Sequence, residues 1–110
     1  MLKMSRLVKK HWSYLRLLMN AESKQQRKQL LITITRDQLR ALTEVVLNLL
    51  QGILPITPAY KNKLKKYRNI IRRIGDTKAS FKKKKELLCR QGAVITLLLK
   101  SVEPSLRGYI

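Results

Sequence analysis

The sequence contains one cysteine and one histidine, and these shortages exclude several kinds of site. Cys89 has no second cysteine to pair with, so neither an intramolecular disulfide nor a cysteine-based metal cluster can form. Beside Leu87 and Leu88, it is most simply a small buried hydrophobic residue. His11 lies in a basic segment without carboxylate or thiol neighbours, so it supports neither a metal site nor a catalytic dyad. We therefore expect no metal ion and no other cofactor.

Acidic residues and glycines are also few, which argues against catalysis. The chain has six acidic residues and no acid pair at helical spacing in an apolar setting, so general acid–base chemistry has no candidates. Glu44 flanks an apolar helical face, where we expect an ion pair with a basic side chain. The four glycines are isolated, which excludes a glycine-rich nucleotide-binding loop, and the serines and threonines have no histidine partner. The sequence thus predicts a protein that is not an enzyme and has no catalytic residues.

Long apolar runs are missing as well. The longest uncharged apolar runs, residues 29–35 and 92–99, are too short to span a bilayer. Basic residues interrupt the N-terminal segment and no small-residue cleavage site follows, so a secretory signal is not expected. The six aromatic residues are too few to favour a platform on which single-stranded bases stack.

What the chain has in abundance is positive charge, with 25 Lys and Arg against 6 Asp and Glu and a net charge of +19. Thirteen of the thirty residues 61–90 are basic, and only Asp76 and Glu86 oppose them, so this segment carries +11. Such a density favours a polyanionic partner, because a compact chain with charge of one sign repels itself. Nucleic-acid phosphates are the first candidate, and anionic membrane lipid is the main competitor.

The basic residues of this segment are the predicted nucleic-acid-binding site. Lysine dominates the set, which favours contact with phosphates over reading of base edges. The set does not by itself distinguish DNA from RNA. It comprises Lys61, Lys63, Lys65, Lys66, Arg68, Arg72, Arg73, Lys78, Lys82, Lys83, Lys84, Lys85 and Arg90.

Apolar residues recur at spacings of three and four along most of the chain, and 110 residues are enough for one domain. We predict an all-α fold, a small bundle of about four to six short helices that includes a basic helical pair. Residues 1–22 would form a basic amphipathic N-terminal helix, residues 23–92 a helical core with the basic DNA-binding pair at 57–90, and residues 93–110 an apolar tail. The β-branched run 31–35 has no strand partner, so we interpret it as a helix end and turn.

Short sequence signals mark the expected ends of these helices. A serine or threonine three residues before a glutamine predicts a capping box, in which two backbone N–H groups are satisfied. A glycine just beyond an apolar stripe suits the C-terminal turn of a helix. We expect starts at Ser23, Thr35, Thr57 and Thr77 or Ser80, and ends at Gly52, Gly75, Gln91-Gly92 and Glu103-Pro104.

Two apolar stripes predict how the core is built. One runs from Leu39 to Leu49 and the other from Leu64 to Ile74, both at helical spacing. The loop at 55–58 is short enough to fold these two helices into an antiparallel pair. Such a pair would bury both stripes and turn the basic face outward.

The turn and the basic segments together carry a resemblance. Residues 47–58 (LNLLQGILPITP), 63–68 (KLKKYR) and 82–88 (KKKKELL), with Gln91 and Gly92, resemble a family of small basic proteins encoded in Maverick/Polinton elements and adintoviruses. These are adenovirus-like transposons and DNA viruses of animal genomes. The resemblance covers roughly residues 15–102. It does not extend to the family's second glycine, since Ala93 follows Gly92, or to an adenovirus-type protease cleavage pattern.

That family has been likened to adenovirus core protein X, the precursor of mu, which also joins a basic region to an apolar tail. The resemblance implies a virion core component that condenses packaged double-stranded DNA, located in the particle and the host nucleus, with capsid proteins as further partners. Two other functions stay open. One is a membrane-active or capsid-lining virion protein that uses its N-terminal helix and apolar tail, and the other is an RNA-binding protein.

Overall fold

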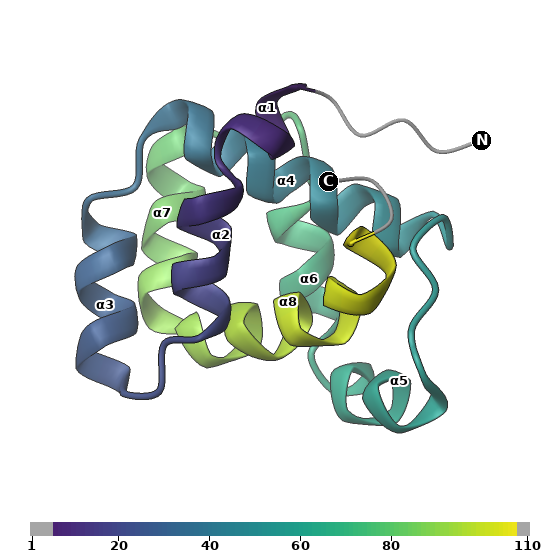
Figure 1. Ribbon diagram of the computed structural model, residues 1–110. Coiled ribbons are helices and arrows are strands. Elements are labelled where there is room, and N and C mark those ends of the chain that lie inside the picture. Colours follow the sequence, from purple (N-terminus) through teal and green to yellow (C-terminus); the bar gives the residue numbers. More distant parts are fainter. Residues whose placement is uncertain (1–5, 108–110) are drawn as a thin grey trace.

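Eight helices joined by short turns make up residues 6–107, the part of the chain that the computed structural model describes, and no strand occurs within it (Figure 1). The predicted all-α fold is confirmed. The two longest helices, α4 and α8, have 15 residues each. In chain order the helices are α1 (Arg6–Lys10), α2 (Trp12–Met19), α3 (Lys24–Ile32), α4 (Arg36–Leu50), α5 (Pro58–Lys65), α6 (Arg68–Ile74), α7 (Phe81–Arg90) and α8 (Gly92–Leu106).

The predicted helix starts are confirmed where a side-chain oxygen accepts a hydrogen bond from a backbone N–H group in the first turn of the helix. Thr35 Oγ1 accepts from the Gln38 N–H at 3.1 Å, while Gln38 Oε1 accepts from the Thr35 N–H at 2.9 Å, which completes a capping box. Ser23 Oγ accepts from the Gln26 N–H at 3.0 Å, but the Gln26 side chain reaches the N–H of Glu22 instead of that of Ser23. The hydroxyls of Thr57 and Ser80 cap α5 and α7 in the same way.

The end of α4 is also as predicted. Gly52 has a φ of 74°, a conformation that side chains disfavour and glycine allows. Its N–H bonds to the Leu49 carbonyl at 3.0 Å, and the N–H of Ile53 bonds to the Asn48 carbonyl at 2.9 Å. This pair of bonds is a Schellman motif, which satisfies carbonyls that the helix leaves free.

Two segments that the pattern predicts as single helices are each broken into two. The first break falls at His11, between α1 and α2, and the second at Lys66–Tyr67, between α5 and α6. At the second break the Tyr67 N–H bonds to the Leu64 carbonyl, a tighter turn than the helix makes. Each break lets the two halves follow different partners, because α1 lies against α4 while α2 lies mainly against α8.

The expected stop at Glu103-Pro104 is wrong, since α8 continues through Pro104 to Leu106. Proline removes the N–H that would bond to the Lys100 carbonyl. Pro104 is exposed, so water can satisfy that carbonyl, while Leu106 is fully buried and draws the last turn onto the core.

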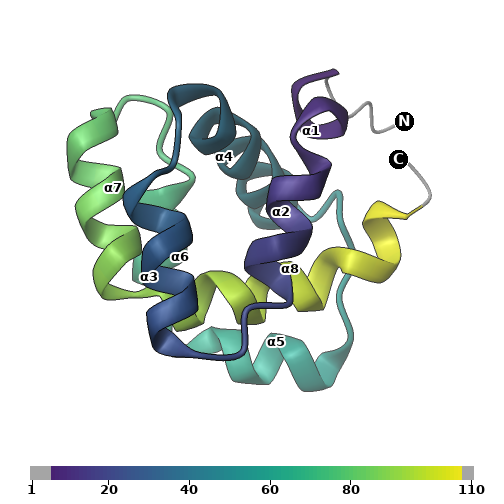
Figure 2. The same cartoon turned by 60° about the vertical axis from the view of Figure 1, so that its left-hand side comes forward.

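The apolar segment after residue 92 forms part of the core. Along α8, the side chains facing inward are buried beneath α2 and α3. Thr96, in the second turn of this helix, donates its hydroxyl to the Leu18 carbonyl of α2 at 2.9 Å. Figure 2 shows α2 lying across α8. The buried apolar residues of α8 are Val94, Ile95, Leu98, Leu99, Val102 and Leu106.

The predicted antiparallel pair of helices is only partly right. Val46 and Leu64 are both buried, with 0% and 5% of their surfaces exposed. However, α6 is the helix that contacts α4, which it crosses in Figure 1, and α5 packs mainly against α8. A Cβ on Gly75, just after α6, would lie 2.9 Å from Leu50 Cδ1 and 3.3 Å from Val46 Cγ1, so this glycine allows the close approach. The break at Lys66–Tyr67 explains the difference, because it turns α5 away from α4.

Candidate nucleic-acid interface

Eleven of the thirteen predicted binding residues are exposed, and they are spread over α5, α6, α7 and the turns between these helices. The exceptions are Lys84, which is buried, and Lys85, which is half-buried. Lys85 Nζ lies 5.9 Å from the centre of the Phe81 ring, a cation–π contact that accounts for its partial burial.

The sequences of α5 and α6 contain no acidic residue that could oppose their cations. No acidic residue occurs between Glu44 and Asp76, while the apolar side chains of both helices face the core. Two of these lysines lie over tyrosine rings, Lys63 Nζ 5.4 Å from the Tyr60 ring centre and Lys66 Nζ 5.1 Å from that of Tyr67. The exposed cations here are Lys61, Lys63, Lys65, Lys66, Arg68, Arg72 and Arg73.

A second group of cations surrounds a cavity of about 310 Å³ between α6 and α7. Arg73, Lys83 and Arg90 line it, but so do Asp76 and Glu86, the two acids of the basic segment. The charges in this cavity therefore partly cancel, and the cations of α5 and α6 that do not line it, such as Lys61, Lys63 and Lys65, are the stronger attractor for a polyanion.

Lys84 is a correction to the predicted set. Only 6% of its surface is exposed, and its Nζ donates to Thr43 Oγ1 on α4 at 3.0 Å. Burial lowers the pKa of the Lys84 ammonium below its ordinary value of 10.5, because the charged form loses hydration, while the negative charge of Asp76 acts in the opposite direction. Lys84 thus joins α7 to α4 inside the protein and is not available to a phosphate.

This buried contact gives a prediction for Thr43→Val, which keeps the side-chain shape and removes the acceptor. We expect a loss of about 1–3 kcal/mol in the free energy of unfolding at neutral pH, because a buried charge loses its hydrogen-bond partner. Denaturant titration measures this loss. An unchanged unfolding midpoint would contradict a stabilising role for the hydrogen bond.

The Lys84 ammonium should also leave a signature in the pH dependence of stability. Because the pKa of Lys84 is lower in the folded state, the unfolded chain binds more protons at pH values between the two pKa values. Stability contributed by this site therefore rises with pH up to about 10.5, the unfolded value. We expect Lys84→Met to lose that rise and Lys83→Met, at an exposed position, to keep it.

Arg36 lies beside the site although it precedes the basic segment in sequence. Its guanidinium is 4.9 Å from the centre of the Phe81 ring at the start of α7. Sequence reasoning missed this residue because its position depends on how α4 meets α7. The stacking partner, a lone phenylalanine ahead of four lysines, gives no local signal of which cation will cover it.

The remaining candidates from the sequence have plain structural settings. Cys89 is half-buried against the core, less than expected. His11 forms the break between α1 and α2, and among the described residues its Nε2 is the buried side-chain atom that lacks a hydrogen-bond partner. Within residues 6–107, no cluster of His, Cys, Asp or Glu side chains has the arrangement of a metal site. In the same range, no helix combines the length and apolar character needed to cross a bilayer.

Comparison of the chain with protein-family models, with curated protein sequences and with solved structures found no match.

Proposed function

We propose that this protein binds double-stranded DNA without sequence preference and condenses it by neutralising phosphates. The observation that carries the proposal is the set of exposed Lys and Arg side chains on α5 and α6. The apolar faces of these two helices are buried, and their sequences contain no acidic residue. Lysine contacts a phosphate as a point charge and reads no base edge, so this surface suits the backbone of any duplex.

The charge and the size of the protein match those of a short piece of duplex. A duplex carries one negative charge per about 1.7 Å of its axis, so a net charge of +19 balances about 32 Å of DNA. The molecule itself measures 33 × 30 × 27 Å. Proteins placed side by side along a duplex would therefore neutralise it nearly completely, which is the condition for condensation.

The setting we propose is the core of a virus or virus-like transposon particle, with the host nucleus as the site of assembly and capsid proteins as further partners. The resemblance to the Maverick/Polinton and adintovirus proteins supports this part of the proposal. The surface chemistry supports only the binding of a polyanion.

The packing of the apolar segments favours nucleic acid over lipid as the partner. A membrane-active protein needs an apolar face that is free to enter the bilayer. Here the apolar faces of α2 and α8 lie against each other, and Leu15, Leu18 and Leu98 are almost fully buried. Lipid binding by these helices would first have to break the core.

Binding measured across a salt series tests the proposal. We expect affinity for duplex DNA to fall steeply with salt, with a log–log slope of about −5 for six phosphate contacts, since each contact contributes about −0.9. Two duplexes of unrelated sequence should bind alike, and anionic vesicles should bind more weakly. A slope near −1, or more than tenfold preference for one DNA sequence, would contradict the proposal. Stronger binding to duplex RNA would reassign the partner.

A further inference from the structure

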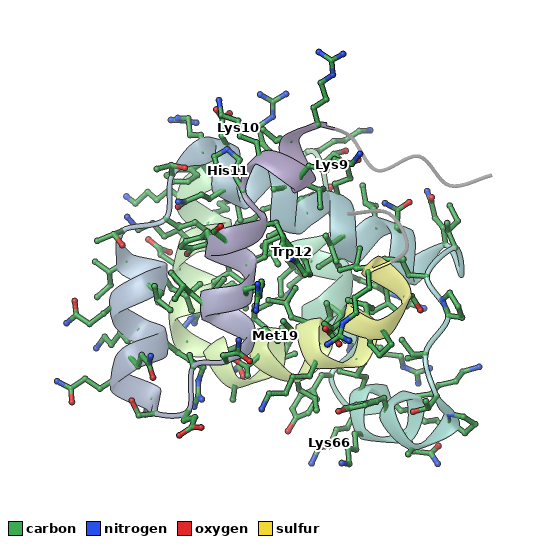
Figure 3. All side chains as sticks on the ribbon, in the orientation of Figure 1. Lys9, Lys10, His11, Trp12, Met19 and Lys66 are labelled. Carbon is green, nitrogen blue, oxygen red and sulfur yellow. The ribbon has the colours of Figure 1, made fainter. Side chains whose placement is uncertain are left out.

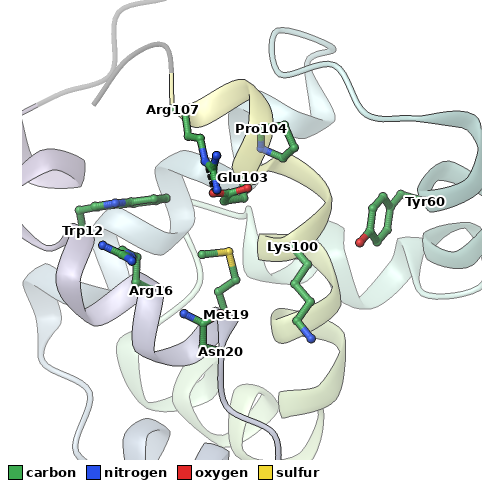
Figure 4. A pocket seen from close by; sticks show the side chains of 9 residues that line it. All are labelled: Trp12, Arg16, Met19, Asn20, Tyr60, Lys100, Glu103, Pro104 and Arg107. Carbon is green, nitrogen blue, oxygen red and sulfur yellow. Dashed lines mark hydrogen bonds and ion pairs between the residues drawn. The ribbon is translucent and has the colours of Figure 1, made fainter.

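A cavity of about 630 Å³ lies between α2, α5 and α8, and through Tyr60 it borders the α5 cation Lys63. Its volume falls in the range typical of sites for small ligands. Figure 4 shows that Trp12 and Arg16 on α2 line one side and Tyr60 on α5 the other, with Met19 and Lys100 between them. Three helices that are distant in sequence thus build one concave site.

The aromatic residues of the chain are few, but the fold brings two of the six to this cavity. Trp12 and Tyr60 are both half-buried, so each ring keeps part of its surface open to solvent. Met19 supplies a polarisable apolar surface next to them. Flat rings and a thioether favour a planar group that can stack by its face, such as a nucleobase.

The charges around the cavity favour an anion. Arg16 and Lys100 are exposed and line it. The one carboxylate in the lining, Glu103, accepts a hydrogen bond from Arg107 on the same helix, so these two charges compensate each other. Arg16 and Lys100 then leave the cavity with an excess of positive charge.

We propose that this cavity binds a short single-stranded segment of nucleic acid, with bases against Trp12 and Tyr60 and phosphates at Arg16 and Lys100. Single-strand sites in proteins combine these two features, a cationic track and aromatic rings on which bases stack. A neutral apolar ligand would leave the two cations without an anion, and an acidic peptide would leave the rings unused. The inference goes beyond duplex binding and does not depend on it.

The fluorescence of Trp12 reports on this site directly, because Trp12 is the only tryptophan. Titration with an oligo(dA) of about eight nucleotides should quench its emission in a saturable way. Ribose 5-phosphate, which has the charge without the base, should quench weakly. Absence of saturable quenching by oligo(dA), or equal quenching by ribose 5-phosphate or by an oligoglutamate peptide, would overturn the proposal.

Variants separate stacking from charge, with binding of labelled oligo(dA) followed by fluorescence anisotropy. Trp12→Leu should weaken binding about 5- to 150-fold, the range for loss of one stacked base, whereas Trp12→Phe should keep most of it. Because Leu and Phe fill the place of the half-buried indole differently, far-UV circular dichroism and the melting temperature of both variants show whether each keeps the fold. Equal affinities for the two variants would overturn a stacking role.

Two substitutions that each remove one charge test the same site without changing the core. Lys100→Gln should weaken binding of oligo(dA), and Lys9→Gln, at an exposed position on α1 outside the cavity, should have little effect. Equal effects of the two changes would overturn the site. The outcome is independent of duplex binding: quenching without duplex affinity would refute only the proposed function, and duplex affinity without quenching would refute only this inference.

Discussion

We expect Val46→Asp to abolish the folded state. Val46 has 0% of its surface exposed and lies where α6 ends against α4. An aspartate there would bury a carboxylate among apolar side chains, and an isolated buried charge costs several kcal/mol. Folded domains have only about 5–15 kcal/mol of stability, so one such change is enough to unfold a chain of 110 residues.

The matched control is Leu17→Asp, which introduces the same charge on α2. Leu17 has 53% of its surface exposed, so the new carboxylate stays hydrated and the cost should be within about 0.5 kcal/mol. Far-UV circular dichroism with thermal unfolding compares the two. If Val46→Asp unfolded cooperatively with the same midpoint temperature as the parent protein, this contact between α4 and α6 would not be part of the core.

The parts of the fold that could be predicted from sequence are those that depend on neighbouring residues. Thr35 and Ser23 satisfy N–H groups three residues away, and Gly52 provides a conformation that its own lack of a side chain allows. The breaks at His11 and at Lys66–Tyr67 could not be predicted in this way. They occur because the two halves of each segment pack on different helices, and that choice depends on the whole core.

The candidate site shows the same division. Exposure of the cations on α5 and α6 follows from the apolar stripes beside them, which bury the opposite faces. The burial of Lys84 had a local signal, because Phe81, Lys84 and Leu88 follow each other at spacings of three and four and so share one helical face. The cavity between Trp12 and Tyr60 had none, since it forms only when α5 turns onto α8.

The second large effect is expected from replacing four exposed cations of α5 and α6 with glutamine: Lys65, Lys66, Arg72 and Arg73. If each contacts a phosphate, the log–log salt slope of duplex binding should become shallower by about 3.6. The affinity near 0.1 M salt should fall on the order of 10³-fold. Helicity should hardly change, because no substitution touches a buried side chain. Circular dichroism and a salt series on the same duplex measure both effects.

The comparison that gives this result its meaning is a second variant with the same loss of charge. Lys3, Arg6, Lys9 and Lys10 provide it, although Lys3 lies outside the described residues. Figure 3 shows Lys9 and Lys10 at the opposite end of the molecule from Lys66. Binding by a defined surface predicts a smaller loss from this variant, because Lys9 and Lys10 lie at the far end of the molecule from Lys66. Equal losses of DNA affinity in the two variants would mean that binding depends on the net charge of the whole protein. The cations of α5 and α6 would then not form a defined binding site.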